Sequence, residues 1–393
     1  MENNTVAPAL RAQEPGTFFE IGSLLTALTH VKDHRKSRGV RYALAPVLAF
    51  MVLAKLSGED RPSGIAHWIS LRAAWLTHAF GLAWKRTPHD ATYRRLMASA
   101  IAVGELEEVV SQFLQSAPGE GVAVLINMDG KSLRGTIPAG QTQGAHLLAA
   151  YQPEVGVVLL QVAVGSKENE ISAAPRLLQA LDLTGKIVTG DAMFAQVELS
   201  RQVVAAGGDY LWTVKDNQPT VRESIETLFV REGAAGGPVE HDFQSAQTID
   251  KGHGRLEQRR LRTSRMLNEY LLWPGVGQVF ELEREVIELG SQQRRHEIVY
   301  GITSLSRAEA SAARLLSISR AHWGIENGLH YVRDVTFKED ATRMKSGTAA
   351  QVLAVLNNLA LGLIRLSGFD NAAEARRWFE ARPQAALDLV LRC

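Results

Sequence analysis

The chain has 393 residues, a net charge of +1 and an ordinary globular composition, which is 46% apolar and 22% charged. It is therefore long enough for two or three domains with a sizeable core. Its single cysteine, Cys393, excludes an intrachain disulfide and a cysteine-based zinc site, which fits a reducing cytoplasm. No secretory leader is visible, and the longest apolar stretch, 42–54, contains Pro46 and is too short to span a bilayer, so we expect a soluble, cytoplasmic protein.

The first third of the chain predicts helices. Residues 1–17 are polar and lack periodicity, which is typical of disorder. Residues 18–118 carry apolar residues at three- and four-residue spacing and predict an all-helical N-terminal domain, followed by a Pro-Gly-Glu-Gly linker. The predicted helices are 21–28, 44–56, 65–79 and 103–114, with breaks at 58–62 and Pro88.

The middle of the chain, 119–218, predicts an α/β domain. Its order of three strands, a helix, a strand and a helix, with acids on two strands, is typical of an RNase H-like mixed sheet flanked by helices. The predicted strands are 122–128, 146–151, 155–164, 186–189 and 210–214, and the predicted helices are 171–183 and 196–206. Residues 152–154 predict the turn of a hairpin.

Residues 219–301 interrupt that alternation and predict a β-rich insertion. Residues 302–366 then complete the α/β domain, and residues 367–393 form a helical tail. The strands expected in the insertion are 258–263, 278–286 and 297–302, and a long helix is expected from about 308 to 335.

Three acidic residues occupy positions that this fold could bring together. Asp129 follows the first strand, Asp191 follows the strand 186–189, and Glu326 lies in the long helix. Carboxylate oxygens suit Mg²⁺ or Mn²⁺, and two such ions about 3.5–4 Å apart can hold the attacking and leaving oxygens of a displacement at phosphorus. Three acids without a cation would repel one another. The cluster predicts two Mg²⁺ (or Mn²⁺) ions, although aspartates at strand ends also commonly form turns.

The helix around Glu326 has two stripes. Glu326 shares one stripe with Trp323, His330 and Arg333, next to an apolar stripe that contains His322. The steps from His322 to Glu326 to His330 allow a transition-metal site, but the spacing is not His-Glu-x-x-His. We expect His322 to be a hydrogen-bonded core histidine. His330 could orient Glu326, contact DNA or be structural.

Three motifs in this chain resemble those of the DDE transposases of bacterial insertion sequences, in particular the ISAs-type, H-repeat-associated subgroup. They are Asp129-Gly-Lys, Gly190-Asp-Ala-Met-Phe-Ala-Gln196 and His322-Trp-Gly-Ile-Glu-Asn-Gly-Leu-His330. Weaker matches at 33–42, 214–218, 252–257 and 334–340 extend the resemblance from 24 to 366.

The resemblance implies an RNase H-like catalytic core in which Asp129, Asp191 and Glu326 bind two Mg²⁺ ions and are catalytic. It implies that water cleaves one strand at each element end, and that the freed 3′-OH attacks target DNA. The implied partners are double-stranded DNA, as terminal inverted repeats and target, and a second copy or more of the chain for synapsis. The implied location is the nucleoid of a bacterial cytoplasm, with no membrane and no organic cofactor.

The sequence departs from the broader group at the cations near the glutamate. Where that group often has Tyr, Arg and Lys around the Glu, this chain has Ser319, His322 and Arg333. The cation that holds the scissile phosphate is therefore open between Arg333, the first choice, and Arg320.

The remaining DNA contacts are expected from basic segments and from residues beside the acids. Clusters of Lys and Arg can neutralise phosphates, but each can equally be a solvated surface. Trp323 could stack on an unpaired base or pack in the core, and the polar residues before Pro219 could contact DNA or form a turn. The candidates are Arg35, Lys36, Arg38 and Arg41 for the terminal repeats, and Lys215, Asn217, Gln218, His253, Arg255, Arg320, Trp323, Asn327, His330, Arg333 and Lys338 elsewhere.

Two other functions remain open from the sequence. One is a DNA-binding protein that is derived from such an element and is catalytically silent. The other is a repair or resolving nuclease on the same fold.

Overall fold

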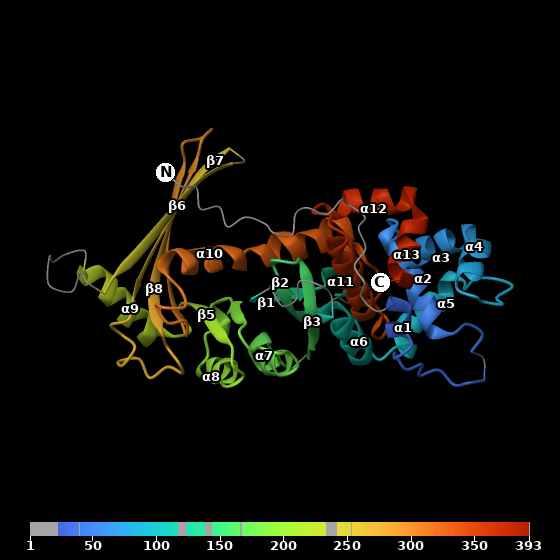
Figure 1. The fold of residues 1–393 in the computed structure, drawn as a ribbon, viewed down its shortest axis with the longest axis horizontal. Coiled ribbons are helices and arrows are strands. Elements are labelled where there is room, and N and C mark those ends of the chain that lie inside the picture. The colour runs from blue at the N-terminus through green and yellow to red at the C-terminus, as the bar shows by residue number, and fades with distance from the viewer. Residues whose placement is uncertain are drawn as a thin grey trace.

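The computed structural model describes residues 23–116, 124–137, 144–232 and 242–392, except for Gly39, Ser166 and His253. The molecule is elongated, with helices at one end, a sheet through the middle and long strands at the other end (Figure 1). The expected disorder of residues 1–17 and the linker at 118–121 fall outside the described residues.

A nine-stranded mixed sheet runs through the molecule in the order β3-β2-β1-β4-β5-β9-β8-β7-β6. β2 pairs antiparallel with both β1 and β3, whereas β1, β4 and β5 are parallel to one another. The five strands of this part are β1 (Leu125–Ser132), β2 (His146–Gln152), β3 (Val157–Val164), β4 (Ile187–Gly190) and β5 (Asp209–Val214). They agree with the strands expected from the sequence.

Helices α7 (Glu170–Gln179) and α8 (Val197–Ala205) pack on this part of the sheet. Their apolar side chains share one core with Val188 of β4 and Trp212 of β5. Both helices lie at the expected places, because their apolar residues recur at helical spacing.

The expected β-rich insertion does not form a separate sheet. Strand β9 pairs antiparallel with β5, so the strands in which this insertion was expected extend the same sheet. The elements of this part of the chain are α9 (Pro219–Glu232), β6 (Gln244–Gly252), β7 (Arg255–Ser264), β8 (Gln278–Glu288) and β9 (Arg294–Thr303). The sequence did not predict β6, because most residues of this edge strand are polar and it lacks an apolar face.

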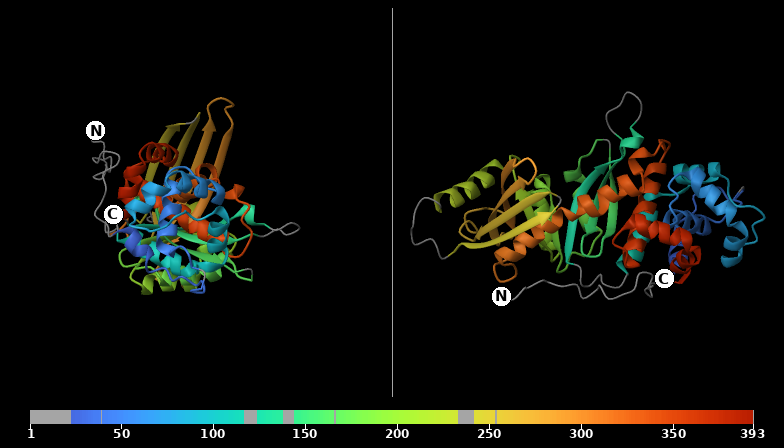
Figure 2. Two further views of the ribbon diagram at one scale, coloured as in Figure 1. Left: turned by 90° about the vertical axis from the view of Figure 1, so that its right-hand side faces the viewer. Right: turned by 90° about the horizontal axis from the view of Figure 1, so that it is seen from above.

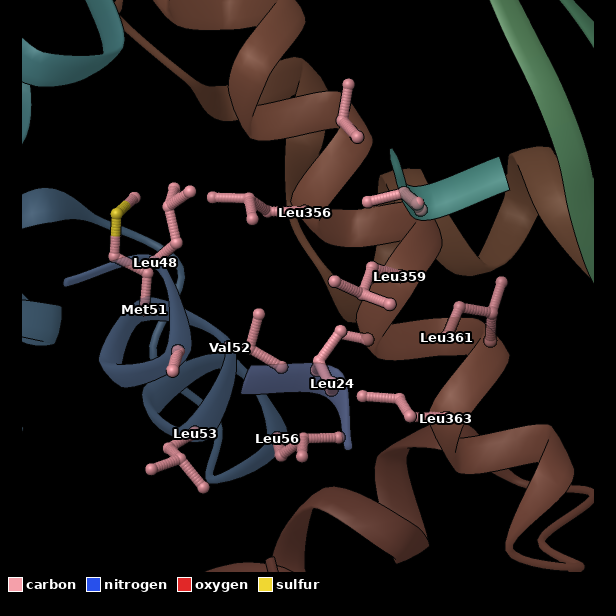
Figure 3. Packing of buried hydrophobic residues seen from close by; sticks show 14 of the residues in the cluster. Leu24, Leu48, Met51, Val52, Leu53, Leu56, Leu356, Leu359, Leu361 and Leu363 are labelled. Carbon is pink, nitrogen blue, oxygen red and sulfur yellow. The ribbon is translucent and has the colours of Figure 1, made fainter. Parts of the chain in front are cut away.

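The N-terminal helices share a core with the C-terminal helices. Leu24, Val52 and Leu56 lie opposite Leu359 and Leu363 (Figure 3). The elements of this end are α1 (Leu24–Leu28), α2 (Leu44–Leu56), α3 (Pro62–Leu71), α4 (Ala73–Ala79), α5 (Asp90–Arg95), the π-helix η1 (Leu96–Ala100), α6 (Val103–Gln115), α11 (Ala349–Leu366), α12 (Ala372–Ala381) and α13 (Pro383–Arg392). The two helical segments that the sequence separates therefore form one helical body, seen end-on and from above in Figure 2.

Helix α11 is the one described helix that is long and apolar enough to cross a membrane, judged by length and composition alone. Within the fold, 89% of its apolar window is buried. That burial is typical of a core helix.

The expected long helix near residues 308–335 is interrupted. Regular α10 spans Ala312–His322, and two wider π-helical turns follow, η5 (Glu326–His330) and η6 (Val332–Thr336). A β-carbon on Gly328 would lie 2.4 Å from the hydroxyl of Tyr151, so glycine lets this segment approach β2 closely. Turns of this kind are rare and often occur at functional sites.

Candidate active site

One face of β1 contacts the helical segment that contains Glu326. Side chains alternate along a strand, and Asn127, Asp129 and Lys131 all point toward this segment. The amide of Asn127 donates to the carbonyl of Ala321 at 2.7 Å, Asp129 Oδ2 lies 2.9 Å from His330 Nε2, and Lys131 Nζ lies 2.6 Å from Asp334 Oδ2. The segment from 321 to 334 therefore lies along β1.

Asp129 and Asp191 follow adjacent positions of two parallel strands. Met128 of β1 pairs with Gly190 of β4, and each aspartate is the next residue. Neighbouring strands lie about 4.8 Å apart. Asp191 follows the end of β4. Asp129, which the sequence predicted to follow the end of its strand, lies inside β1, because β1 continues to Ser132. The two aspartates are therefore on neighbouring strand paths, and only Asp191 is at a strand end.

Each aspartate has a histidine partner from the helical segment. His322 Nε2 lies 3.4 Å from Asp191 Oδ1, and His330 Nε2 lies 2.9 Å from Asp129 Oδ2. The hydrogen bond from His322 holds the pKa of Asp191 below its usual value, against the opposing effect of burial, and the charges of His322 and Lys215 lower this pKa further.

Glu326 is exposed, halfway between these two histidines in sequence. Glu326 begins the π-helical turn η5, so α-helical spacing does not place it on the same side as His322 and His330, and unlike His330 it is exposed. Across the described ranges, no three His, Cys, Asp or Glu side chains converge closely enough to hold an ion. The expected triad thus has its two aspartates adjacent, while the glutamate points outward.

The chemistry of these residues nevertheless fits a divalent cation. The aspartates offer oxygen ligands on neighbouring strand paths, which suit Mg²⁺ and Mn²⁺. The carboxylate of Glu326 makes no hydrogen bond or ion pair with the described part of the chain, so no such contact holds its long side chain away from the aspartates.

A groove of about 210 Å³ opens beside Asp191. Strands β7, β8 and β9 form one wall, and the end of α10 forms the other. Arg284 lies with its guanidinium 5.9 Å from the ring centre of Trp323, which is 59% exposed. The charged and aromatic residues that line the groove are Asp191, Lys215, Arg259, Arg284, Glu297, Arg320, His322 and Trp323. The pairing of β7 with β8 sets Arg259 directly opposite Arg284, which the sequence could not reveal.

Arg333 is not the phosphate-holding cation that the sequence favoured. Its side chain is fully buried, and its guanidinium contacts Glu339 at 2.8 Å and Gln161 at 2.9 Å. A buried cation in such a pair cannot reach solvent-borne DNA without leaving Glu339 unpaired. Arg320, the second choice, lies on the groove and is 40% exposed, 3.1 Å from Asp250.

Several other expected DNA contacts have structural partners instead. The amides of Asn217 and Gln218 donate to the carbonyls of Ala192 and Ala195 and so hold the turn after Asp191. His330 is buried against Asp129, which removes it from the list of DNA contacts. These polar side chains fix the site rather than face a ligand.

The remaining candidates lie farther along the surface. Arg255 is the first residue of β7 and is exposed, and Asn327 is exposed next to Glu326. His253 falls outside the described residues. Lys338 lines a cleft of about 700 Å³ together with residues that the sequence did not single out, Arg61 and Arg94, and with Arg343.

The N-terminal cations form a second positive cleft, of about 460 Å³. Arg35 and Arg41 line it together with Arg95 of α5, and Lys36 and Arg38 are exposed nearby in the chain. Arg35 also binds Asp33 and the carbonyl of Tyr42, so part of its charge is already paired.

Comparison with known proteins identifies related sequences. Residues 121–363 match the family model described as "Transposase DDE domain", and residues 25–114 match "DDE_Tnp_1-associated". The chain is 30% identical to "Putative transposase YncI" of Escherichia coli O157:H7 over 88% of each chain. It is 27% identical to "H repeat-associated putative transposase YhhI" of Escherichia coli strain K12, over 88% of this chain and 91% of that one.

Among solved structures, the fold overlaps with a piggyBac transposase in a synaptic complex with hairpin DNA. That overlap has a TM-score of 0.43 and 9% identity, and it covers 96% of this chain and 79% of the other.

Proposed function

Because the chain belongs to the family of DDE transposases, we propose that it cuts DNA at the ends of an insertion sequence and joins the freed 3′-OH to target DNA. The observation that carries this proposal is the placement of Asp129 and Asp191 on neighbouring parallel strands, beside the helical segment that contains Glu326. Acids of this kind, held on neighbouring strand paths of a sheet, are what metal-dependent phosphoryl transfer needs.

The sheet supports an RNase H-like core for this activity. In the order β3-β2-β1-β4-β5, the first three strands are antiparallel and the last two are parallel to β1. We propose that these five strands and their helices are the catalytic core, and that β6 to β9 are an insertion that has joined its edge.

Asp129, Asp191 and Glu326 would hold two Mg²⁺ or Mn²⁺ ions. When bound, such ions activate the attacking hydroxyl and neutralise charge at the phosphorus. His330 orients Asp129 by its hydrogen bond, and the partly buried pair of Lys131 with Asp334 keeps the helical segment on β1.

The groove beside Asp191 is proposed to hold the DNA strand that is cut. Arg320 would neutralise the phosphate near the acids, with Lys215 and the pair Arg259 and Arg284 along the path. Trp323, exposed beside them, would stack on an unpaired base. The flanking duplex would continue over the positive clefts of the helical end, and two copies of the chain would be needed to hold two DNA ends.

Cleavage of short duplexes that carry the terminal repeats of the element tests this proposal. The full chain should nick the end in the presence of Mg²⁺ or Mn²⁺, and Asp129→Asn should reduce the rate by at least about 10²–10³-fold, as loss of one charge-stabilising group does. End binding by Asp129→Asn should stay close to that of the unmodified chain. Binding without any cleavage by the unmodified chain would instead identify a silent DNA-binding protein.

A further inference from the structure

A buried amide fixes the first link of a hydrogen-bond chain below Asp191. The side chain of Asn127 is fully buried, and its Nδ2 lies 2.7 Å from the carbonyl of Ala321 and 3.2 Å from that of His322. A carbonyl oxygen only accepts hydrogen bonds. The nitrogen of Asn127 therefore faces the end of α10, and its Oδ1 faces Thr189.

The hydroxyl of Thr189 is the second link. Thr189 Oγ1 lies 2.8 Å from Asn127 Oδ1, which can only accept, so the one hydroxyl proton of Thr189 is used there. The same Oγ1 lies 3.0 Å from His322 Nδ1 and must accept from it. His322 Nδ1 thus carries a proton, and in the neutral imidazole Nε2 presents a lone pair.

In the protonated ring Nε2–H donates to Asp191, and in the neutral ring the lone pair of Nε2 is directed at the same carboxylate. His322 Nε2 lies 3.4 Å from Asp191 Oδ1, well beyond the roughly 2.7–2.9 Å of a charge-assisted hydrogen bond. Two ligands that each lie about 2.1 Å from one ion are about 3.0 Å apart at a right angle and about 3.4 Å apart at a tetrahedral angle. The separation is within hydrogen-bond reach and also allows both atoms to bind a common ion.

We infer that His322 Nε2 is a ligand of the divalent ion held by Asp191, which makes this half of the site a mixed nitrogen and oxygen site. The inference rests on the proposed function, because the transposase chemistry requires an ion at Asp191. Thr189 is the outer partner of the ligand histidine, of the kind that fixes ring orientation in known metal sites. Two protein ligands leave positions for Glu326, water and a DNA phosphate.

His330 differs from His322 and provides a matched control. Its Nε2 lies 2.9 Å from Asp129 Oδ2, a normal hydrogen-bond length, and in the described part of the chain its buried Nδ1 has no hydrogen-bond partner. This arrangement fits an imidazole whose Nε2–H donates to Asp129. His330 is therefore a positioning residue and contributes no lone pair to an ion.

A nitrogen ligand changes the metal preference. Imidazole binds transition metals well, whereas Mg²⁺ prefers oxygen ligands only. The Asp191 site should therefore bind Mn²⁺ more tightly than Mg²⁺, and His322 should be the cause of most of that difference.

Electron spin-echo spectroscopy of the full chain loaded with Mn²⁺ tests the ligand directly. The unmodified chain should show coupling to an imidazole ¹⁴N, which His322→Ala should abolish and His330→Ala should retain. The dissociation constant of Mn²⁺ can be titrated by its electron spin resonance signal. It should be about 10–100-fold higher for Thr189→Val than for the unmodified chain, as for the loss of other outer partners of metal ligands. Mg²⁺ affinity, measured by competition, should change less.

Two outcomes would overturn the inference. One is that the unmodified chain binds Mn²⁺ but shows no ¹⁴N coupling. This measurement does not depend on the folding of any variant. The other is that His322→Ala binds Mn²⁺ at least as tightly as the unmodified chain does. That result would mean that His322 competes with the ion for Asp191. In either case, metal-dependent cleavage that is lost in Asp129→Asn would leave the proposed function standing.

Discussion

At the scale of single residues, the cations near the site differ in how their charge is already used. The ion pair between Arg320 and Asp250 is partly exposed, and such pairs are worth only about 0–1 kcal/mol. Arg320 can therefore exchange Asp250 for a DNA phosphate at little cost. The pair between Arg333 and Glu339 is fully buried, and removing one partner would strand the other charge.

Replacing these two arginines should separate DNA binding from stability. Arg320→Gln should weaken binding of a duplex end and reduce the salt dependence of binding by about one phosphate contact, with unchanged stability. Arg333→Gln should lower the free energy of unfolding by roughly 3–5 kcal/mol. Fluorescence anisotropy at several salt concentrations and urea denaturation measure the two effects. Equal salt slopes for Arg320→Gln and the unmodified chain would exclude a phosphate contact.

At the scale of elements, the helical segment after α10 is held against the sheet by close approach. There is no room for a β-carbon on Gly328 below the Tyr151 hydroxyl. A β-carbon on Gly324 would lie 3.3 Å from Pro153. Helical spacing in the sequence predicts one regular helix here, but the contacts with β1 and β2 coincide with wider turns. Tertiary contacts therefore decide the position of Glu326.

Adding a methyl group at Gly328 should move this segment. Gly328→Ala should destabilise the fold by about 1–3 kcal/mol, as overpacking does, and should slow cleavage. The change Tyr151→Phe removes the oxygen at 2.4 Å, so the double variant should recover much of both losses. A double-mutant cycle from urea denaturation measures this coupling. Additive losses would mean that the two side chains do not meet, and Gly324→Ala should be the milder control.

At the scale of the whole molecule, a buried polar network joins the helical end to the sheet. Gln161 of β3 donates to Glu107 of α6 at 3.0 Å and accepts from Arg333, while Glu339 accepts from Asn357 of α11. Lys55 of α2 donates to the same Asn357 at 2.6 Å. The N-terminal helices are thus tied to the core through hydrogen bonds as well as through the shared apolar core.

This network should make stability depend on pH. Burial raises the pKa of Glu107 to about 8, although the hydrogen bond from Gln161 and the charge of Arg333 oppose it. The folded state then holds a proton that the unfolded state releases above about pH 4.5. Stability should therefore fall between about pH 4.5 and 8, by up to about 1.4 kcal/mol per pH unit.

The isosteric change Glu107→Gln separates this group from all others. The variant should lose most of the decline in stability over this range, because its amide does not titrate. Urea denaturation at several pH values measures the change. The same slope in the variant and the unmodified chain would show that Glu107 is ionised in the fold.

The sequence by itself determined the strands and helices of the core, the position of Asp191 after a strand end and the family, because these depend on local spacing and motifs. Asp129 lies inside β1 instead, since the strand continues to Ser132. Only the tertiary structure decided which polar groups meet. His322 and Asp191 are 131 residues apart, His330 and Asp129 are 201 apart, and Arg333 enters the core through partners on other elements. Local spacing carries no information about such contacts, because the packing of β1 against a distant helical segment selects them.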